Sequence, residues 1–323
     1  MNLDLTILLL QLHLGQVQMI KHKLSCNKYI WYIIYIYIFF MIIWLASYPK
    51  SGNTWIRSFI ISLMLKNRKK LKLEDLENIK QFPTKSQYFK TGINIDYNNF
   101  DEVSKYWIQV QRKINSDKKI RFFKTHNSFC KKGDSLFTNS TNTLGVIHIV
   151  RDPRNIISSI KNHYHHDSLE ESKNFIFDET RGIFVKTPGK GDFALPQVLG
   201  SWQTHYNSWK KIDKNYLLIK YENLIKNPEE EFRKVVNYLN KLIRINFDEE
   251  QINNAISCSS FEKLKNLENL DGFTESTVDK RTGQKKKFFF LGPKNDWREL
   301  VDEKIVHSIE KKFKKEMNEL GYI

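Results

Sequence analysis

Residues 44–60 read WLASYPKSGNTWIRSFI and combine an apolar run, a short polar turn and a second apolar segment. The first run is typical of a buried strand, and the segment after Thr54 has the apolar spacing of a helix. The turn between them carries Lys50, Ser51 and Gly52. A loop that turns its backbone N–H groups inward ahead of a helix N-terminus binds phosphate or sulfate. The stretch therefore predicts an anion-binding loop, although it lacks the G-x-x-x-x-G-K-[ST] spacing of a Walker A motif.

The composition is that of a folded, basic protein. The chain has 323 residues, of which 41% are hydrophobic and 13% aromatic. This is enough for one large α/β domain or two small ones with a proper core. The formal net charge of +16 indicates anionic partners. Lysine is abundant along the whole chain, however, so the charge by itself selects no function.

The N-terminal region allows two interpretations. Residues 29–45 are uncharged over about one membrane crossing and follow several lysines, as in a signal anchor. The same run continues into SYPKSG without a linker, so a membrane helix would consume the strand that must precede the turn. We therefore expect residues 1–40 to be a non-native or unstructured leader and residues 41–323 to form the domain. The expected location is the cytoplasm, or a membrane if residues 29–45 are a real anchor.

Strands and helices alternate after residue 41. Strands are expected at 41–49, 119–125, 144–150 and 216–220. Helices are expected at 54–66, 73–80, 99–115, 153–163, 197–212, 227–241 and 302–320, and residues 167–196 have the composition of a loop. This order predicts an α/β fold with a P-loop-like open parallel sheet flanked by helices in a three-layer α/β/α arrangement. Ligands of such sheets bind beyond the carboxyl ends of the strands.

Polar residues gather at those strand ends. They comprise several cations and hydroxyls, one histidine and few carboxylates. They are Lys50, Ser51, Gly52, Asn53 and Thr54 after the first strand, Lys124, Thr125 and His126 at the second, Arg151 with Ser158 and Ser159 at the third, and Tyr221 and Glu222 at the fourth. A basic loop with Arg281, Thr282 and Gly283 follows, ahead of Asn295, Asp296 and Trp297.

Several of these segments resemble the cytosolic-type sulfotransferases in the order that the family has them. YPKSGNTW resembles the 5′-phosphosulfate loop, IVRDPRNIISSI the 3′-phosphate segment, and FFKTHN the catalytic strand end. LLIKYENLIKNPEEEF is similar to the Y-E-D…N-P segment, and RTG followed by NDW to R-K-G-x-x-G-D-W. The resemblance implies 3′-phosphoadenylyl sulfate (PAPS) as co-substrate and in-line transfer of its sulfuryl group to a hydroxyl or amine.

The chemistry of the residues agrees with this resemblance. Negative charge builds on the leaving phosphate oxygen, so a preorganised cation there lowers the barrier, and Lys50 is the candidate. The acceptor loses a proton as it attacks, and a neutral imidazole suits that task, so His126 is the expected general base. Lys124 lies two residues away on the same strand face, from which it can reach the transferring group.

The resemblance also implies the remaining nucleotide contacts. Backbone N–H groups of Ser51–Thr54 would surround the 5′-phosphate, and Arg151 with Ser159 would hold the 3′-phosphate. Arg281 and Gly283 would close over it. Trp55 and Phe261 would stack on the adenine, and Tyr221 and Ser259 would bond its edge. Two departures are visible, because Thr282 replaces the family's lysine and the stretch from Gly283 to Trp297 is longer. We hypothesise that Lys285–Lys287 compensate.

Two other functions would leave different patterns in the sequence. A nucleotide or small-molecule kinase would show a Walker A motif and a strand-end aspartate for magnesium, and a nucleic-acid binder would gather its basic residues on one stripe. Neither pattern is evident, so we expect no metal and no nucleic-acid partner. The acceptor would be a small alcohol, phenol or amine. A set of aromatic residues hints at an apolar acceptor wall; these are Phe82, Tyr88, Phe89, Phe175, Phe177 and Phe184.

Overall fold

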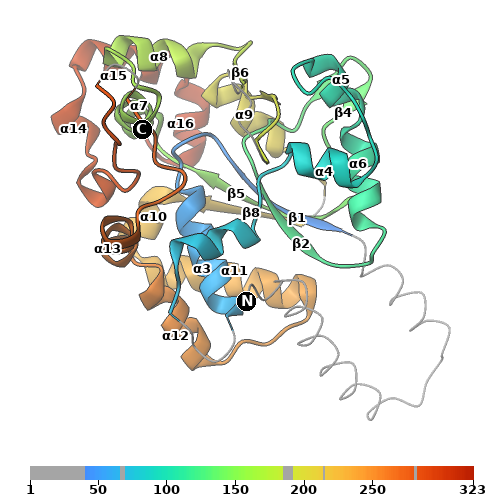
Figure 1. Ribbon diagram of the computed structural model, residues 1–323. Helices are drawn as coiled ribbons and strands as arrows, with labels where there is room; N and C mark the ends of the chain where they lie inside the picture. Colours follow the sequence, from blue (N-terminus) through green and yellow to red (C-terminus); the bar gives the residue numbers. More distant parts are fainter. Residues whose placement is uncertain (1–40, 66–69, 185–191, 214, 280–281) are drawn as a thin grey trace.

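A four-stranded parallel sheet forms the centre of the molecule (Figure 1). The computed structural model describes residues 41–65, 70–184, 192–213, 215–279 and 282–323, so the leader expected over residues 1–40 lies outside it. The sheet order is β2-β1-β5-β8, and every neighbouring pair is parallel. The strands are β1 Ile42–Ser47, β2 Arg121–Thr125, β5 Thr143–Val150 and β8 Tyr216–Lys220. Each overlaps the strand expected from the sequence.

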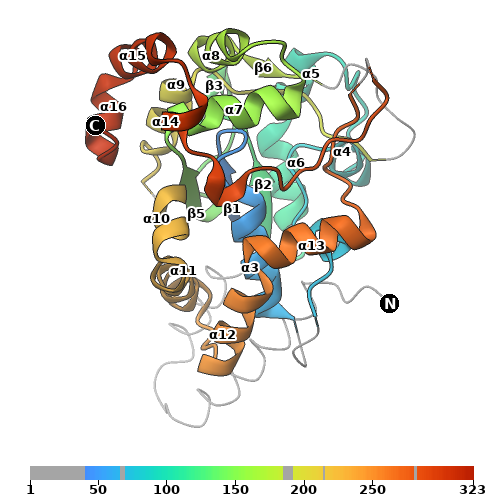
Figure 2. The ribbon, with the colours of Figure 1, turned by 90° about the vertical axis from the view of Figure 1, so that its left-hand side faces the viewer.

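Strand β1 is buried on both faces, which explains its continuous apolar sequence. Ile43 and Leu45 belong to one hydrophobic cluster, whereas Ile42, Trp44 and Ala46 belong to another. Successive side chains of a strand point to opposite faces, so these clusters lie on opposite sides of the sheet. The predicted three-layer arrangement is confirmed, with helices over both faces (Figures 1 and 2).

One face carries helix α3 (Asn53–Met64), which starts directly after the polar turn, with α11 (Pro228–Ile243) and α12 (Glu249–Cys258). The first of these was expected, and α11 starts at the proline of the predicted N-P segment. The other face carries α6 (Trp107–Asn115) and α9 (Trp202–Trp209) near β1. Helix α7 (Pro153–Tyr164) follows β5 and packs in a third cluster beside them.

The remaining elements connect or cover these layers. The short helices are η2 Leu73–Asn78, α4 Lys85–Lys90, α5 Phe100–Lys105, α10 Tyr221–Lys226, η3 Gly292–Lys294, α14 Trp297–Leu300 and α16 Lys314–Leu320. The longer ones are α8 Leu169–Phe177, α13 Phe261–Asp271 and α15 Glu303–Lys312. Two small antiparallel pairs join β3 Lys131–Lys132 to β4 Ser135–Leu136 and β6 Gly182–Ile183 to β7 Gln197–Val198.

Two expectations about the segment between β5 and β8 were wrong. Residues 167–196 are not all loop, because α8 begins after Ser168, whose side chain accepts a hydrogen bond from the backbone N–H of Glu171. Phe175 and Ile176 then bury one side of this helix. The helix expected from residue 197 begins at Trp202, after β7 and the N-cap Ser201.

Among the described residues, no helix combines the length and apolar character needed to cross a membrane.

Candidate functional site

A cavity of about 470 Å³ opens at the carboxyl ends of the parallel strands. The residues proposed for this edge meet there from five separate segments of the chain. Those that line the cavity are Lys50, Gly52, Asn53, Thr54, Trp55, Lys124, His126, Arg151, Ser159, Tyr221 and Phe261. The parallel sheet thus brings together side chains that are far apart in sequence, as the strand-end pattern predicted.

The loop between β1 and α3 requires an unusual backbone. Lys50 has a φ of 67° and Gly52 a φ of 102°, both in the left-handed region. A Cβ at Gly52 would also lie 2.6 Å from the ring carbon Cδ2 of Tyr221. Any other residue at position 52 would therefore be strained and would collide with that ring, which explains the glycine.

The N-terminus of α3 is open toward the cavity. Its first turn carries no acidic residue and no side chain caps it. Among the described residues, the backbone N–H groups of Gly52, Asn53 and Thr54 have no hydrogen-bond partner, and the buried hydroxyl of Ser51 has none either. Asn53 ties the loop to β1 by donating to the carbonyl of Leu45 at 2.9 Å. This arrangement of unpaired donors at a helix N-terminus suits an anion.

The ring of His126 is held in one tautomer. Its Nδ1 lies 2.7 Å from the carbonyl oxygen of Ser47, which can only accept a hydrogen bond. Nδ1 therefore carries the proton, and Nε2 keeps its lone pair. Burial and the neighbouring Lys124 lower the pKa of His126 to about 3. The imidazole is consequently neutral at physiological pH, as a general base must be before it takes a proton.

Two lysines face the cavity under strong desolvation. The Nζ of Lys50 lies 3.9 Å from the ring centroid of Phe288. Burial lowers the pKa of Lys50 to about 7, and the charges of Lys124 and Arg151 act in the same direction. Burial also lowers the pKa of Lys124. The carboxylate of Glu275, whose Oε2 lies 3.2 Å from Nζ of Lys124, acts in the opposite direction and raises this pKa. The site thus concentrates positive charge that an anionic ligand would stabilise.

Arg151 and Ser159 lie together as the sequence predicted, although eight positions separate them. The Nη1 of Arg151 donates to Ser159 Oγ at 3.3 Å and to the carbonyl of Lys50 at 3.0 Å. Its guanidinium stacks 4.1 Å from the ring centroid of Tyr221. The side chain of Asn295 donates to Ser159 Oγ at 3.0 Å and so joins the C-terminal region to this group. Arg151 is therefore fixed between the loop at Lys50 and helix α7.

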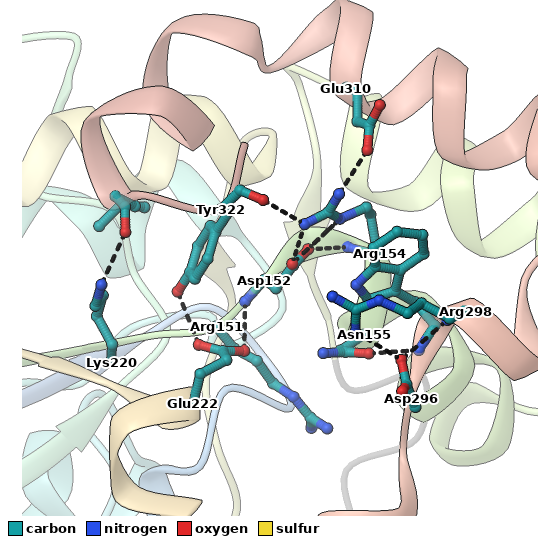
Figure 3. Close-up of polar contacts among 12 residues, drawn as sticks. Arg151, Asp152, Arg154, Asn155, Lys220, Glu222, Asp296, Arg298, Glu310 and Tyr322 are labelled. Atoms are coloured by element: carbon teal, nitrogen blue, oxygen red, sulfur yellow. Dashed lines mark hydrogen bonds and ion pairs between the residues drawn. The ribbon is translucent and has the colours of Figure 1, made fainter. Parts of the chain in front are cut away.

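The strand end next to Arg151 is secured by the C-terminal segment (Figure 3). Arg154 donates to Asp152 at 2.6 Å and to the carbonyl of Tyr322 at 2.7 Å. The hydroxyl of Tyr322 donates to Glu222 at 2.9 Å, and Glu222 accepts the backbone N–H of Asp152 at 2.9 Å. This closed set of buried and partly buried hydrogen bonds restrains the backbone beside Arg151.

Some of the proposed site residues do not line the cavity. Ser259 is buried and donates to the carbonyl of Ala255 in its own helix at 2.8 Å. Thr282 and Gly283 are exposed and lie outside the lining, as do the side chains of Lys285–Lys287. Arg281 lies outside the described residues.

The suggested aromatic acceptor wall does not form. None of its members belongs to the cavity lining. Phe82 and Tyr88 pack instead in the core beside Trp44, and Phe89 is 73% exposed. Phe175 and Phe177 lie on α8, where they pack in or against the third hydrophobic cluster, and Phe184 is exposed after β6. The aromatic composition of these segments alone therefore did not identify cavity residues.

Sequence reasoning missed the part of the cavity that residues 274–277 and 288–292 contribute. A usable signal was present, because counting back from Trp297 by the family's G-x-x-G-D-W spacing reaches Gly292 rather than Gly283. Gly292 has a φ of 56°, and a Cβ there would lie 2.2 Å from the ring of Phe261. No comparable local pattern marked Glu275, since its importance comes from contacts with distant residues.

Comparisons with known proteins agree with this site. The sequence model described as the sulfotransferase domain matches residues 42–321. Cytosolic sulfotransferase 12 of Arabidopsis thaliana is 24% identical over 84% of this chain and 76% of its own length. Mouse sulfotransferase SULT7A1, solved with PAP, has a TM-score of 0.52 at 19% identity and covers 86% of this chain and 85% of its own.

A second solved structure, retinol dehydratase in a complex with retinol and PAP, also has a TM-score of 0.52, at 18% identity over 85% of this chain and 81% of its own. At such identities the two structures support the fold, whereas the sequence model covers nearly all of the described domain. A kinase is not favoured by any of these findings. The chain belongs to the sulfotransferase domain family.

Proposed function

We propose that this sulfotransferase moves the sulfuryl group of PAPS to a hydroxyl or amine of a small molecule, with His126 as general base. The observation that carries the proposal is the convergence of Lys50, Lys124, Arg151 and His126 on one cavity next to the open N-terminus of α3. Sulfuryl transfer requires little covalent chemistry from the protein. The protein therefore contributes mainly positioning and charge stabilisation, which the three cations supply, and the histidine accepts the proton.

The donor would lie with its 5′-phosphosulfate at the anion-binding loop and its 3′-phosphate at Arg151 and Ser159. The unpaired N–H groups of Gly52, Asn53 and Thr54 would then receive phosphate oxygens, and Lys50 would stabilise charge on the leaving oxygen. Trp55 and Phe261 line the same cavity, where they would enclose the adenine. The leaving product is adenosine 3′,5′-bisphosphate.

The acceptor would lose its proton to Nε2 of His126, the nitrogen that the Ser47 contact leaves free. The cavity that His126 lines is also lined by Tyr164, Ile183, Leu195 and Gln197, a mixture of apolar, phenol and amide groups. We infer a largely apolar small alcohol, phenol or amine as acceptor. Retinol is present in one similar solved structure. The relatives named cytosolic sulfotransferases support a cytoplasmic location.

Adenosine 3′,5′-bisphosphate should stabilise the protein more than ATP with magnesium or duplex DNA does. A ligand present at about 100 times its dissociation constant adds about 2.7 kcal/mol, which corresponds to a rise of about 5 °C in Tm. Thermal-shift measurements with the three ligands at equal concentration check this. Stabilisation by ATP–magnesium alone would support the kinase, and stabilisation by DNA alone would support the nucleic-acid binder.

Binding of adenosine 3′,5′-bisphosphate should weaken as the pH rises from about 7 to 9. Burial lowers the pKa of Lys50 to about 7, and a bound phosphate would raise this pKa because it favours the charged amine. Complex formation in this range therefore takes up a proton, and affinity falls by up to about tenfold per pH unit.

Isothermal titration calorimetry in buffers of different ionisation enthalpy measures both the affinity and the proton uptake. The range above pH 7 avoids the second ionisation of the ligand's own phosphates, at about 6. Lys50→Arg, which stays charged at these pH values, should flatten the profile. A flat wild-type profile without proton uptake would show that Lys50 is already charged before the nucleotide binds.

A further inference from the structure

A single carboxylate lies among the cations of the cavity. Of the described residues that line it, Glu275 is the only acidic one. It belongs to the segment between α13 and η3, and its side chain is 23% exposed. A carboxylate inside a site built for anions opposes ligand binding, so its presence calls for a physical reason.

Glu275 connects a fixed cation to one that faces the ligand. Its Oε1 accepts from Nη1 of Arg57 at 2.5 Å, and its Oε2 accepts from Nζ of Lys124 at 3.2 Å. Arg57 is 3% exposed on α3 and is held by a second bond to the carbonyl of Leu76 at 2.8 Å. Arg57 therefore anchors the carboxylate, and the carboxylate determines where the ammonium group of Lys124 lies.

The two cations differ in their access to ligand. Lys124 and Glu275 line both the main cavity and an adjoining pocket of about 180 Å³, whereas Arg57 lines only the adjoining pocket. Flanked by two cations, Glu275 keeps its pKa well below the usual range, through the charges of Arg57 and Lys124, despite its burial. The carboxylate is thus ionised at physiological pH, and it remains negatively charged beside any bound anion.

We propose that Glu275 is a positioning residue that directs Lys124 toward the transferring group and, as an internal anion of the site, limits the affinity for the nucleotide so that the bisphosphate product leaves. The proposal rests on the proposed function. Without Glu275, Lys124 is free to move to the nucleotide phosphates and binds them more strongly. Loss of Glu275 should therefore raise the affinity for the nucleotide and lower the turnover, so the two quantities change in opposite directions.

Glu275→Gln should bind adenosine 3′,5′-bisphosphate about tenfold more tightly than the wild type, since a negative charge near the ligand is removed. Its dissociation rate should fall by a similar factor, because affinity changes within one site appear mainly in dissociation. Calorimetry gives the affinity and stopped-flow displacement gives the rate. Glu275→Asp keeps the charge and should stay within about threefold of the wild type.

Glu77→Gln is the matched control. Glu77 is an exposed carboxylate of η2 that lines the adjoining pocket without an ion pair to Arg57 or Lys124. It removes the same charge and should leave nucleotide affinity within about twofold of the wild type. Equal tightening in both variants would show a general charge effect and overturn the role of Glu275.

A second variant covers the case in which Glu275→Gln does not fold, because Arg57 loses its partner. The double variant Arg57→Gln with Glu275→Gln leaves no unpaired buried guanidinium. It should still bind the nucleotide at least threefold more tightly than the wild type, since Arg57 does not line the main cavity. Unchanged or weaker binding in the folded variants would show that Glu275 is merely structural.

The wild-type measurement separates this inference from the proposed function. Absence of nucleotide binding by the wild type would overturn both, because Glu275 would then have no anion to oppose. Binding by the wild type together with unchanged affinity in the Glu275 variants would overturn the inference alone.

Discussion

Replacing His126 by alanine should lower kcat by about 10²- to 10⁴-fold while leaving adenosine 3′,5′-bisphosphate binding within about threefold of the wild type. The loss is that of a general base positioned for proton transfer. Binding should persist because the ring of His126 contacts Ser47 and its backbone N–H donates to Gln197, and neither partner is one of the proposed phosphate-binding residues.

The measurement uses labelled PAPS with an acceptor identified by screening alcohols, phenols, amines and glycans. His126→Asn makes the test sharper, because its amide can donate to the Ser47 carbonyl as Nδ1 does but offers no base. It should lose as much activity as His126→Ala. His307→Ala on the exposed surface of α15 is the control and should retain full turnover. Full activity in both His126 variants, or an equal loss on replacing the second cavity histidine His163 instead, would contradict the assignment.

Replacing Lys50 by methionine should lower kcat by about 10²- to 10³-fold, with a smaller loss of nucleotide affinity. Removing one preorganised group that stabilises transition-state charge has effects of this size. Methionine preserves much of the aliphatic stem that packs near Phe288, so the change mainly removes the ammonium group. Because charge on the bridging oxygen grows during transfer, the rate should suffer more than binding.

Single-turnover kinetics with saturating donor separates the transfer step from binding. Lys85→Met is the matched control, since its ammonium also lies near aromatic rings, those of Tyr97 and Phe193, but outside the cavity lining. That variant should behave as the wild type does. A Lys50→Met enzyme with reduced affinity but an unchanged transfer rate would show that Lys50 binds ground-state donor only.

The predictions made from short segments agree best with the structure. A run such as residues 144–150 forms a central strand because its side chains are apolar on both faces, and Pro153 starts α7 because proline suits the first helical turn. The same local logic failed for residues 167–196. There Ser168 as N-cap, with Glu170 and Glu171 in the first turn, indicated helix α8. The glycines and prolines farther along instead led to the prediction of a loop for the whole segment.

Sequence by itself determined the parallel sheet, its strand ends and the polar residues that follow them, because periodicity, caps and turns act within a few neighbours. It also determined the turn between β1 and α3, where Gly52 has a left-handed backbone, although the close approach of Tyr221 to Gly52 comes from the tertiary structure. Only the tertiary structure decided that residues 274–277 line the cavity, and that Glu275 joins Arg57, 218 positions away, to Lys124. Such contacts depend on how whole layers pack, and no local pattern of residues encodes that packing.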